Sequence, residues 1–156
     1  MTAQQGIDPR SPRFGAGITA ILLLVVIGLD LAGADLAATI LFAAITLLFA
    51  WGAFAGVKRH PYGAIYRATL RPRLKPPTEL EDPVPPTFAQ GVGFVITGVA
   101  LVLHLVGVPY ALVIGASLAF VAAFLNSVFA YCLGCQIYLL LVRAGILGRS
   151  KGAVAA

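Results

Sequence analysis

The amino-acid sequence predicts an all-α fold, a bundle of four transmembrane helices, on three observations. Of the 156 residues, 60% are hydrophobic and 11% are charged, whereas soluble domains carry roughly 25% charged residues. The mean hydropathy is +0.94. Apolar stretches of about 20 residues recur, each long enough to cross a bilayer as a helix, and none alternates as a membrane β-strand would. These observations exclude a soluble enzyme, a disordered tail and a disulfide-stapled secreted module.

The apolar stretches predict the helices one by one, within a single integral membrane domain of residues 1–156. We expect transmembrane helices over residues 14–34, 36–57, 88–108 and 110–142. The last stretch is too long for one straight crossing, because as a helix it would reach ~50 Å against a hydrocarbon core of ~30 Å. It must therefore tilt, bend or continue beyond the core, and Gly134 is where we expect a bend.

The basic residues predict the orientation of these helices. All 11 fall before the first stretch, between the second and third, or after the fourth, and the other two connections contain none. By the positive-inside rule, both termini and the central loop, residues 58–87, face the cytoplasm of a plasma (inner) membrane. The net charge of +5 therefore indicates contact with anionic lipid. We expect no nucleic-acid partner, because the basic residues are not interleaved with aromatic ones along a groove.

The central loop divides into an interfacial part and a proline-rich part. The first contains Tyr62 and Tyr66 among basic residues and predicts a short helix at the headgroup boundary, with its rings at the interface. The second, between residues 76 and 86, contains five prolines and predicts an extended, stiff connector. Candidate ligands for an anion or a lipid phosphate are Arg67, Arg71 and Arg73. Candidate contacts for docking a cytosolic partner are Glu79, Glu81 and Asp82, the alternative being a solvated connector.

Two cysteines are the candidate catalytic residues. Cys132 and Cys135 lie three residues apart, a spacing that puts both on one face of a helix and within disulfide reach. In a reducing compartment such a pair is a transient redox or sulfur-carrying pair. Packing is one alternative, since cysteine fills helix contacts. A metal site is another, but the pair supplies half of a tetrahedral site, and neither His60 nor His104 has a spacing that completes it. We therefore predict no metal.

Two further ionisable residues lie near the outer ends of their predicted helices, Asp30 and His104. A buried pair would handle protons, because ionisable residues inside a membrane are costly, and interfacial hydration is the alternative. The sequence contains no Ser–His–Asp arrangement, phosphate-binding loop or dinucleotide fingerprint, and no recognisable quinone or flavin site. We therefore expect no cofactor.

Several segments resemble DUF4395, a family of bacterial membrane proteins known as a domain of unknown function. In chain order they are residues 8–14 (DPRSPRF), 60–63 (HPYG), 71–74 (RPRL), 81–90 (EDPVPPTFAQ), 124–126 (FLN) and 132–135 (CLGC). The resemblance covers nearly the whole chain. Thr87 stands where the family often has a basic residue, which implies a weaker anion contact there. Family members are encoded near rhodanese-type sulfurtransferases and thioredoxin-like proteins, which implies sulfur or disulfide traffic.

Together these features predict a membrane thiol protein that takes part in disulfide or persulfide exchange, or a sulfur relay, on the cytoplasmic side. One of Cys132 and Cys135 would attack and the other resolve, while the central loop docks a thioredoxin-like or rhodanese-like protein. One alternative is transport of a small sulfur species, which requires a homo-oligomer because four helices rarely enclose a path. A non-catalytic membrane scaffold is the other alternative.

Overall fold

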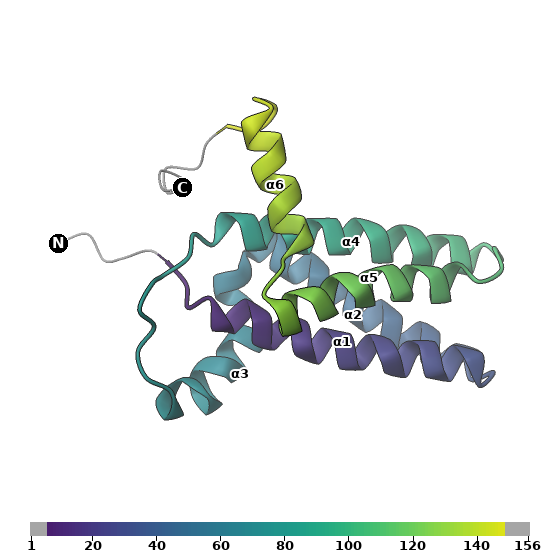
Figure 1. Ribbon diagram of the computed structural model, residues 1–156. Helices are drawn as coiled ribbons and strands as arrows, with labels where there is room; N and C mark the ends of the chain where they lie inside the picture. The colour runs from purple at the N-terminus through teal and green to yellow at the C-terminus, as the bar shows by residue number, and fades with distance from the viewer. Residues whose placement is uncertain (1–5, 149–156) are drawn as a thin grey trace.

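The computed structural model describes residues 6–148, and the two termini, whose side of the membrane the sequence predicts, lie outside this range. Four helices are long and apolar enough to cross a membrane: α1 (Arg10–Leu31), α2 (Asp35–Ala55), α4 (Val84–Leu105) and α5 (Ala111–Phe129). The shorter helical elements are η1 (Val57–Arg59), α3 (Pro61–Thr69), η2 (Arg71–Arg73) and α6 (Leu133–Arg143). The long helices form a bundle, and α3 and α6 lie toward one end of it (Figure 1). This arrangement confirms the predicted all-α fold and indicates a membrane protein.

Helices α1 and α4 begin before the apolar stretches that predicted them. Pro12 lies in the first turn of α1, and Pro85 and Pro86 lie in the first turn of α4. A proline fits there because its missing N–H would have no partner within the helix. The predicted extended connector is therefore wrong from Val84 onward, where α4 has already begun.

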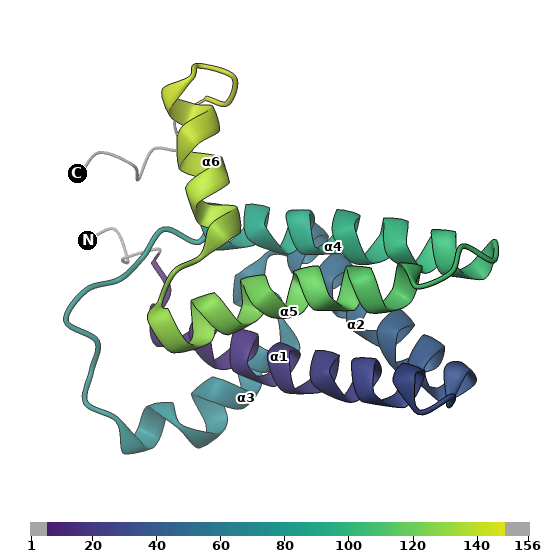
Figure 2. The ribbon, with the colours of Figure 1, turned by 45° about the vertical axis from the view of Figure 1, so that its right-hand side comes forward.

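The fourth apolar stretch is two helices rather than one span over residues 110–142. Helix α5 ends at Phe129, and Ala130 takes a left-handed conformation with φ 57°. The Tyr131 N–H donates to the Leu125 carbonyl at 3.1 Å and closes the end of α5. Helix α6 then turns steeply away from the bundle (Figures 1 and 2). A bend was expected, but it lies before Gly134.

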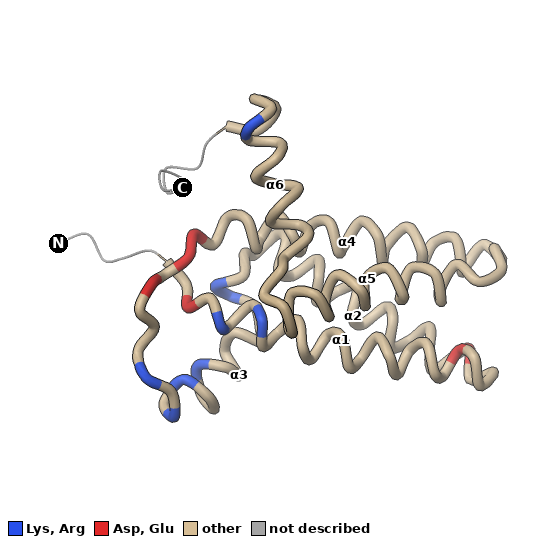
Figure 3. The backbone as a smooth tube through the Cα atoms, viewed as in Figure 1, with Lys and Arg blue, Asp and Glu red and all other residues tan. Residues whose placement is uncertain are grey.

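Charged residues gather at the end of the bundle from which α3 and α6 project. We call this the charged end, and it comprises residues 6–15, 53–90 and 126–148. Lys and Arg residues of the described chain lie here, and an acidic segment marks the opposite end (Figure 3), where Asp30 lies in the last turn of α1 and Asp35 begins α2. The basic residues of the described chain are thus confined to one end of the bundle, as the sequence predicts.

The half of the bundle away from the charged end is filled by an apolar core. Its buried residues come from all four long helices: Leu23, Val26, Ala38, Phe42, Ile45, Ala100, Leu112, Ala116 and Ala119. Gly115 allows α5 to approach α4 closely, because a Cβ at this position would overlap Ala100. Small residues commonly permit such contacts between membrane helices. The core fills the interior of this half of the bundle, and the larger cavity lies toward the charged end.

Candidate functional site

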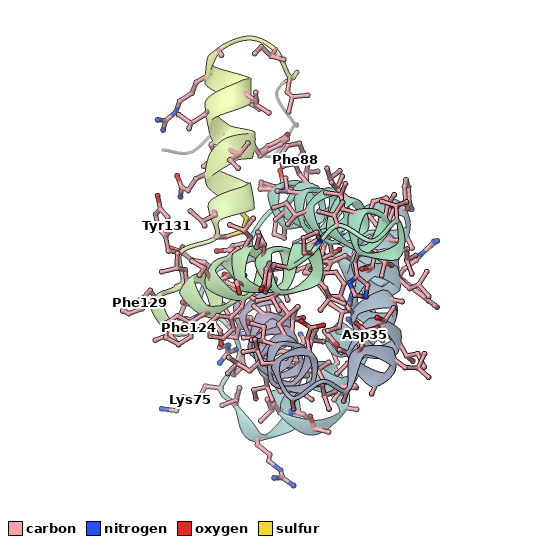
Figure 4. The ribbon with its side chains drawn as sticks, turned by 90° about the vertical axis from the view of Figure 1, so that its right-hand side faces the viewer. Asp35, Lys75, Phe88, Phe124, Phe129 and Tyr131 are labelled. Carbon is pink, nitrogen blue, oxygen red and sulfur yellow. A yellow bond between two sulfur atoms is a disulfide. The ribbon has the colours of Figure 1, made fainter. Side chains whose placement is uncertain are left out.

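A disulfide joins Cys132 to Cys135, with their Cα atoms 5.2 Å apart. Cys132 is the residue immediately before α6, and its Sγ accepts the backbone N–H of Cys135, in the first turn, at 3.3 Å. Both cysteines are partly exposed. The sulfur atoms lie at the base of α6, where this helix meets the bundle (Figure 4). The pair is thus close enough to bond, but it occupies a helix N-terminus rather than the interior of a span.

Helix α6 is held against α4 through one face of its first two turns. A Cβ at Gly134 would lie 2.5 Å from the Cα and Cβ of Ala89, so only glycine fits this contact without a shift. Tyr138, which is 5% exposed, packs on Phe88 with ring centroids 5.5 Å apart. Residues four apart lie on one helix face, so both contacts hold the same face of α6. They fix the position of the disulfide beside the bundle.

A partly open cavity of about 760 Å³ lies beside the disulfide, in the half of the bundle nearer the charged end, and Cys132 lines it. Helices α1, α3, α4 and α5 form most of its walls. Space is left in part because several of the lining residues are small: Ala16, Ala119, Ala122 and Ala123. Cavities of roughly 300–1,000 Å³ are typical of small-molecule sites. The chain therefore places one sulfur of the pair on a space large enough to hold a ligand.

A buried carboxylate ties the start of α1 to α3 at the cavity wall. Asp8 is 8% exposed. Its Oδ1 accepts the Arg10 N–H and Nε at 3.0 and 2.9 Å, and its Oδ2 accepts Arg10 Nη2 at 2.8 Å and the Tyr66 hydroxyl at 3.0 Å. The hydrogen bonds from Arg10 hold the pKa of Asp8 below its ordinary value, although burial opposes them. Tyr66 is 1% exposed, so its ring packs inside the protein rather than contacting headgroups as predicted.

His60 positions α3 through both of its ring nitrogens. Nδ1 accepts the Tyr62 N–H at 3.3 Å, at the start of α3, and Nε2 donates to the Leu48 carbonyl at 3.1 Å. These partners define the neutral tautomer, and burial lowers the pKa of His60. Neither nitrogen is left for a ligand. Over residues 6–148, no cluster of three or more His, Cys, Asp or Glu side chains could hold a metal ion.

The three candidate arginines separate into two groups. Arg67 and Arg71 line the cavity. Arg67 Nη1 makes one long hydrogen bond, 3.4 Å, to the Lys58 carbonyl. All three are exposed, and Arg73, which lies in the same short helical turn as Arg71, lines no part of the cavity. The structure therefore brings two of the three together with Cys132 around one space.

The three candidate acids lie along the connector that precedes α4. The backbone of Glu81 pairs with that of Ile7 through two hydrogen bonds of 2.9 Å, and its side chain is exposed. Although this side chain reaches solvent, the buried part of its surroundings raises the pKa of Glu81, and the charge of Arg13 opposes that rise. Asp82 Oδ1 accepts the Val84 N–H at 2.9 Å at the start of α4, and Glu79 is exposed. Glu81 therefore holds the connector to the N-terminal segment, and Glu79 and Glu81 present acidic groups to solvent.

At the opposite end of the bundle, His104 pairs with Asp35 rather than with Asp30, the acid considered from the sequence. His104 Nε2 lies 2.9 Å from Thr39 Oγ1 and 3.3 Å from Asp35 Oδ1. Asp30 only lines the same small surface pocket. Asp35 is closer because it begins α2, directly across from the last turn of α4.

Replacing Asp8 by asparagine is expected to lower stability at neutral pH by about 2 kcal/mol, because charge-assisted hydrogen bonds are lost. The folded-state pKa of Asp8 lies below its ordinary value of 3.8, so its contribution is present above that value. It is lost as the pH falls through the folded pKa. Thermal unfolding in detergent between pH 7 and pH 2 measures this. If the variant is less stable than the wild type by the same amount at pH 7 and at pH 2, the assignment is wrong.

Four helices long and apolar enough to span a membrane, with a disulfide beside a cavity at the charged end, indicate a helical membrane protein with a paired-cysteine site. The chain matches the model of the family "Domain of unknown function (DUF4395)" over residues 7–143 and belongs to that family. No curated protein and no solved structure matches the chain. Membership confirms the resemblance seen in the sequence, and it assigns no activity to Cys132 and Cys135.

Proposed function

We propose that the protein exchanges disulfides with a soluble partner through Cys132 and Cys135, at the cytoplasmic face of the plasma (inner) membrane. One observation carries the proposal: the pair is bonded, partly exposed and located at a helix N-terminus beside a cavity. A buried structural pair would have no access to a partner. A helix N-terminus also stabilises thiolate, which is the reactive species in exchange.

The exchange runs in two balanced steps. A partner thiolate attacks Cys132 Sγ, the Cys132–Cys135 bond breaks, and Cys135 leaves as a thiolate that takes up a proton. A second partner thiolate then attacks the partner sulfur of the mixed disulfide. It expels Cys132 as a thiolate that the Cys135 N–H stabilises, so the partner becomes oxidised and the pair gains two electrons and two protons. In the reverse sequence Cys132 attacks an oxidised partner, and Cys135 then attacks Cys132 Sγ and restores the bond.

The cytoplasmic orientation is supported by the charge distribution. Basic residues of the described chain lie at the charged end, the end that carries the disulfide (Figure 3). Positively charged segments remain in the cytoplasm during membrane insertion. A thioredoxin-like or rhodanese-like protein is the partner class that we propose, and Glu79 and Glu81 on the connector would contact it. Persulfide transfer by the same pair, assembly into an oligomer and a scaffold role stay predictions.

The apolar core favours exchange over transport for the single chain. The cavity reaches Ile96 on α4 and Leu118 on α5, whereas Ala100 and Ala116 belong to the buried core beyond it. A solute path would have to cross that core. Uptake of a labelled sulfur species by vesicles, lost with both cysteines, would favour transport instead.

The proposal is tested in sealed vesicles of known orientation. Reduced thioredoxin is added to one side, and new thiols are counted with a membrane-impermeant alkylating reagent added to either side. We expect two thiols per chain after reduction from the cytoplasmic side, labelled from that side only, and none in a Cys132→Ser/Cys135→Ser variant. If the number of labelled thiols stays the same after any added dithiol, the exchange is refuted. Labelling only from the outer side would refute the orientation.

A further inference from the structure

We propose that the cavity binds an anionic amphiphile, a molecule with one acidic head group and an apolar chain. This site goes beyond thiol exchange, because its occupancy depends on charge and shape and can be measured whatever the cysteines do. The shared chemistry fits a free carboxylate, as in a fatty acid, and a lipid phosphate. Each step of the inference rests on residues that line the cavity.

The mouth of the cavity carries positive charge without an internal counter-ion. Lys58, Arg67 and Arg71 line the cavity and are also exposed, so they lie where it opens to solvent, and none of them makes an ion pair with another described residue. The one lining acid, Asp8, is already satisfied by hydrogen bonds from Arg10 and Tyr66. An acidic head group would therefore complement the mouth, and arginine is well suited to grip a carboxylate or phosphate.

The interior of the cavity is apolar and elongated. Along α4, the lining residues run from Pro86 near the charged end to Ile96, a distance of ~15 Å at 1.5 Å per residue. The lining in this part is apolar and includes Phe49, Val92 and Ile96, together with Leu118 and Val121, which are also exposed on the surface of the bundle. A small inorganic anion would leave this volume empty, whereas an alkyl chain would fill it. The combination of cationic mouth and apolar depth selects an amphiphile.

Two amide side chains lie between the cationic mouth and the apolar depth. Gln90 of α4 and Asn126 of α5 both line the cavity, and neither side chain has a hydrogen-bond partner among the described residues. Ligand sites are typically apolar with a few polar groups that fix the orientation of the ligand. These two amides would hydrogen-bond the part of the ligand next to its head group.

Binding is tested with the purified protein in nonionic detergent and two fluorescent probes, dansyl-undecanoic acid and its uncharged methyl ester. We expect saturable binding of the acid and at least about tenfold weaker binding of the ester, a difference of about 1.4 kcal/mol. Displacement by oleate and by phosphatidate, assayed separately, distinguishes the carboxylate from the lipid-phosphate source. Equal affinity for acid and ester would overturn the proposal, as would displacement by neither competitor.

Variants locate the binding in this cavity. Arg67→Gln combined with Arg71→Gln should weaken binding of the acid about tenfold or more and leave binding of the ester unchanged. Arg73→Gln is the matched control, because Arg73 lies in the same turn as Arg71 but outside the cavity. Ala122→Phe, which fills the interior, should abolish binding while the protein still elutes as the wild type does in gel filtration. If Arg73→Gln weakens binding of the acid as much as the double variant does, the probe binds through general surface charge and the proposed site is refuted.

Discussion

A Cys135→Ser variant, once reduced, should form a stable mixed disulfide with glutathione on Cys132, whereas a Cys132→Ser variant should form far less. Removal of the second thiol removes the group that resolves the intermediate, so turnover should fall about 100-fold or more in either variant. Intact-protein mass spectrometry after addition of glutathione disulfide measures the trapped adduct. The wild type should show the Cys132–Cys135 disulfide and almost no adduct.

The asymmetry of the trapped adduct follows from the geometry of the first turn of α6. Cys132 Sγ lies at the helix N-terminus and accepts the Cys135 N–H at 3.3 Å, so negative charge on this sulfur is stabilised. The Sγ of Cys135 is not the acceptor of that N–H. Trapping on Cys135 instead would reverse the assignment of the attacking thiol. Trapping in neither single variant would leave the pair without exchange chemistry.

A control separates loss of chemistry from loss of fold. Neither serine substitution should unfold the protein, because α6 is also held through Gly134 and Tyr138. Thermal unfolding of both single variants and of the double variant in detergent should therefore stay close to that of the reduced wild type. A variant that fails this control is compared only after its folded fraction has been isolated.

The spans were predictable because of a general constraint on backbone in lipid. Every N–H and C=O inside the hydrocarbon core must be paired within the element, so long apolar stretches become helices. Their ends were less predictable. Val84 begins α4 inside a proline-rich segment, because prolines disfavour a helix interior but not its first turn.

The break after α5 carries no clear signal in the sequence. A left-handed residue at a helix end is usually glycine, which has no Cβ to clash, and Gly134 was therefore the expected bend. The structure places Ala130 in that conformation. Gly134 is needed instead for close packing on Ala89. Sequence spacing does not distinguish these two uses of glycine.

The cavity was equally hidden from sequence reasoning. Gly115 and Ala122 lie seven residues apart on one face of α5, and both are small. Gly115 contacts α4 at Ala100, whereas Ala122 lines open space. The distinction depends on how far apart the neighbouring helices lie at each level. The same applies to Asp8 and Tyr66, which are far apart in sequence and meet only in the folded chain.

A Gly134→Ala substitution should separate the first turn of α6 from α4. The added Cβ would lie 2.5 Å from the Cα and Cβ of Ala89, and backbone cannot move aside as a flexible side chain can. Overpacking of this kind costs about 1–3 kcal/mol. Because that free energy is lost from the α4–α6 contact, amide hydrogen exchange along α6 should accelerate roughly tenfold or more. Reduction of the disulfide by added glutathione should also become faster, since the pair loses its fixed position.

Gly98→Ala provides the matched control for this effect. Gly98 lies in α4 with no atom within 4 Å of an added Cβ, so alanine there should leave α6 unchanged and favour the helix slightly. Equal exchange rates in the two variants would show that α6 does not depend on the contact with Ala89. A second outcome is that hydrogen exchange in α6 accelerates in Gly134→Ala while the disulfide is reduced at the wild-type rate. In that case the α4–α6 contact positions the helix but does not control access to the sulfurs. Faster reduction in Gly134→Ala alone would link the α4–α6 contact to the reactivity of the pair.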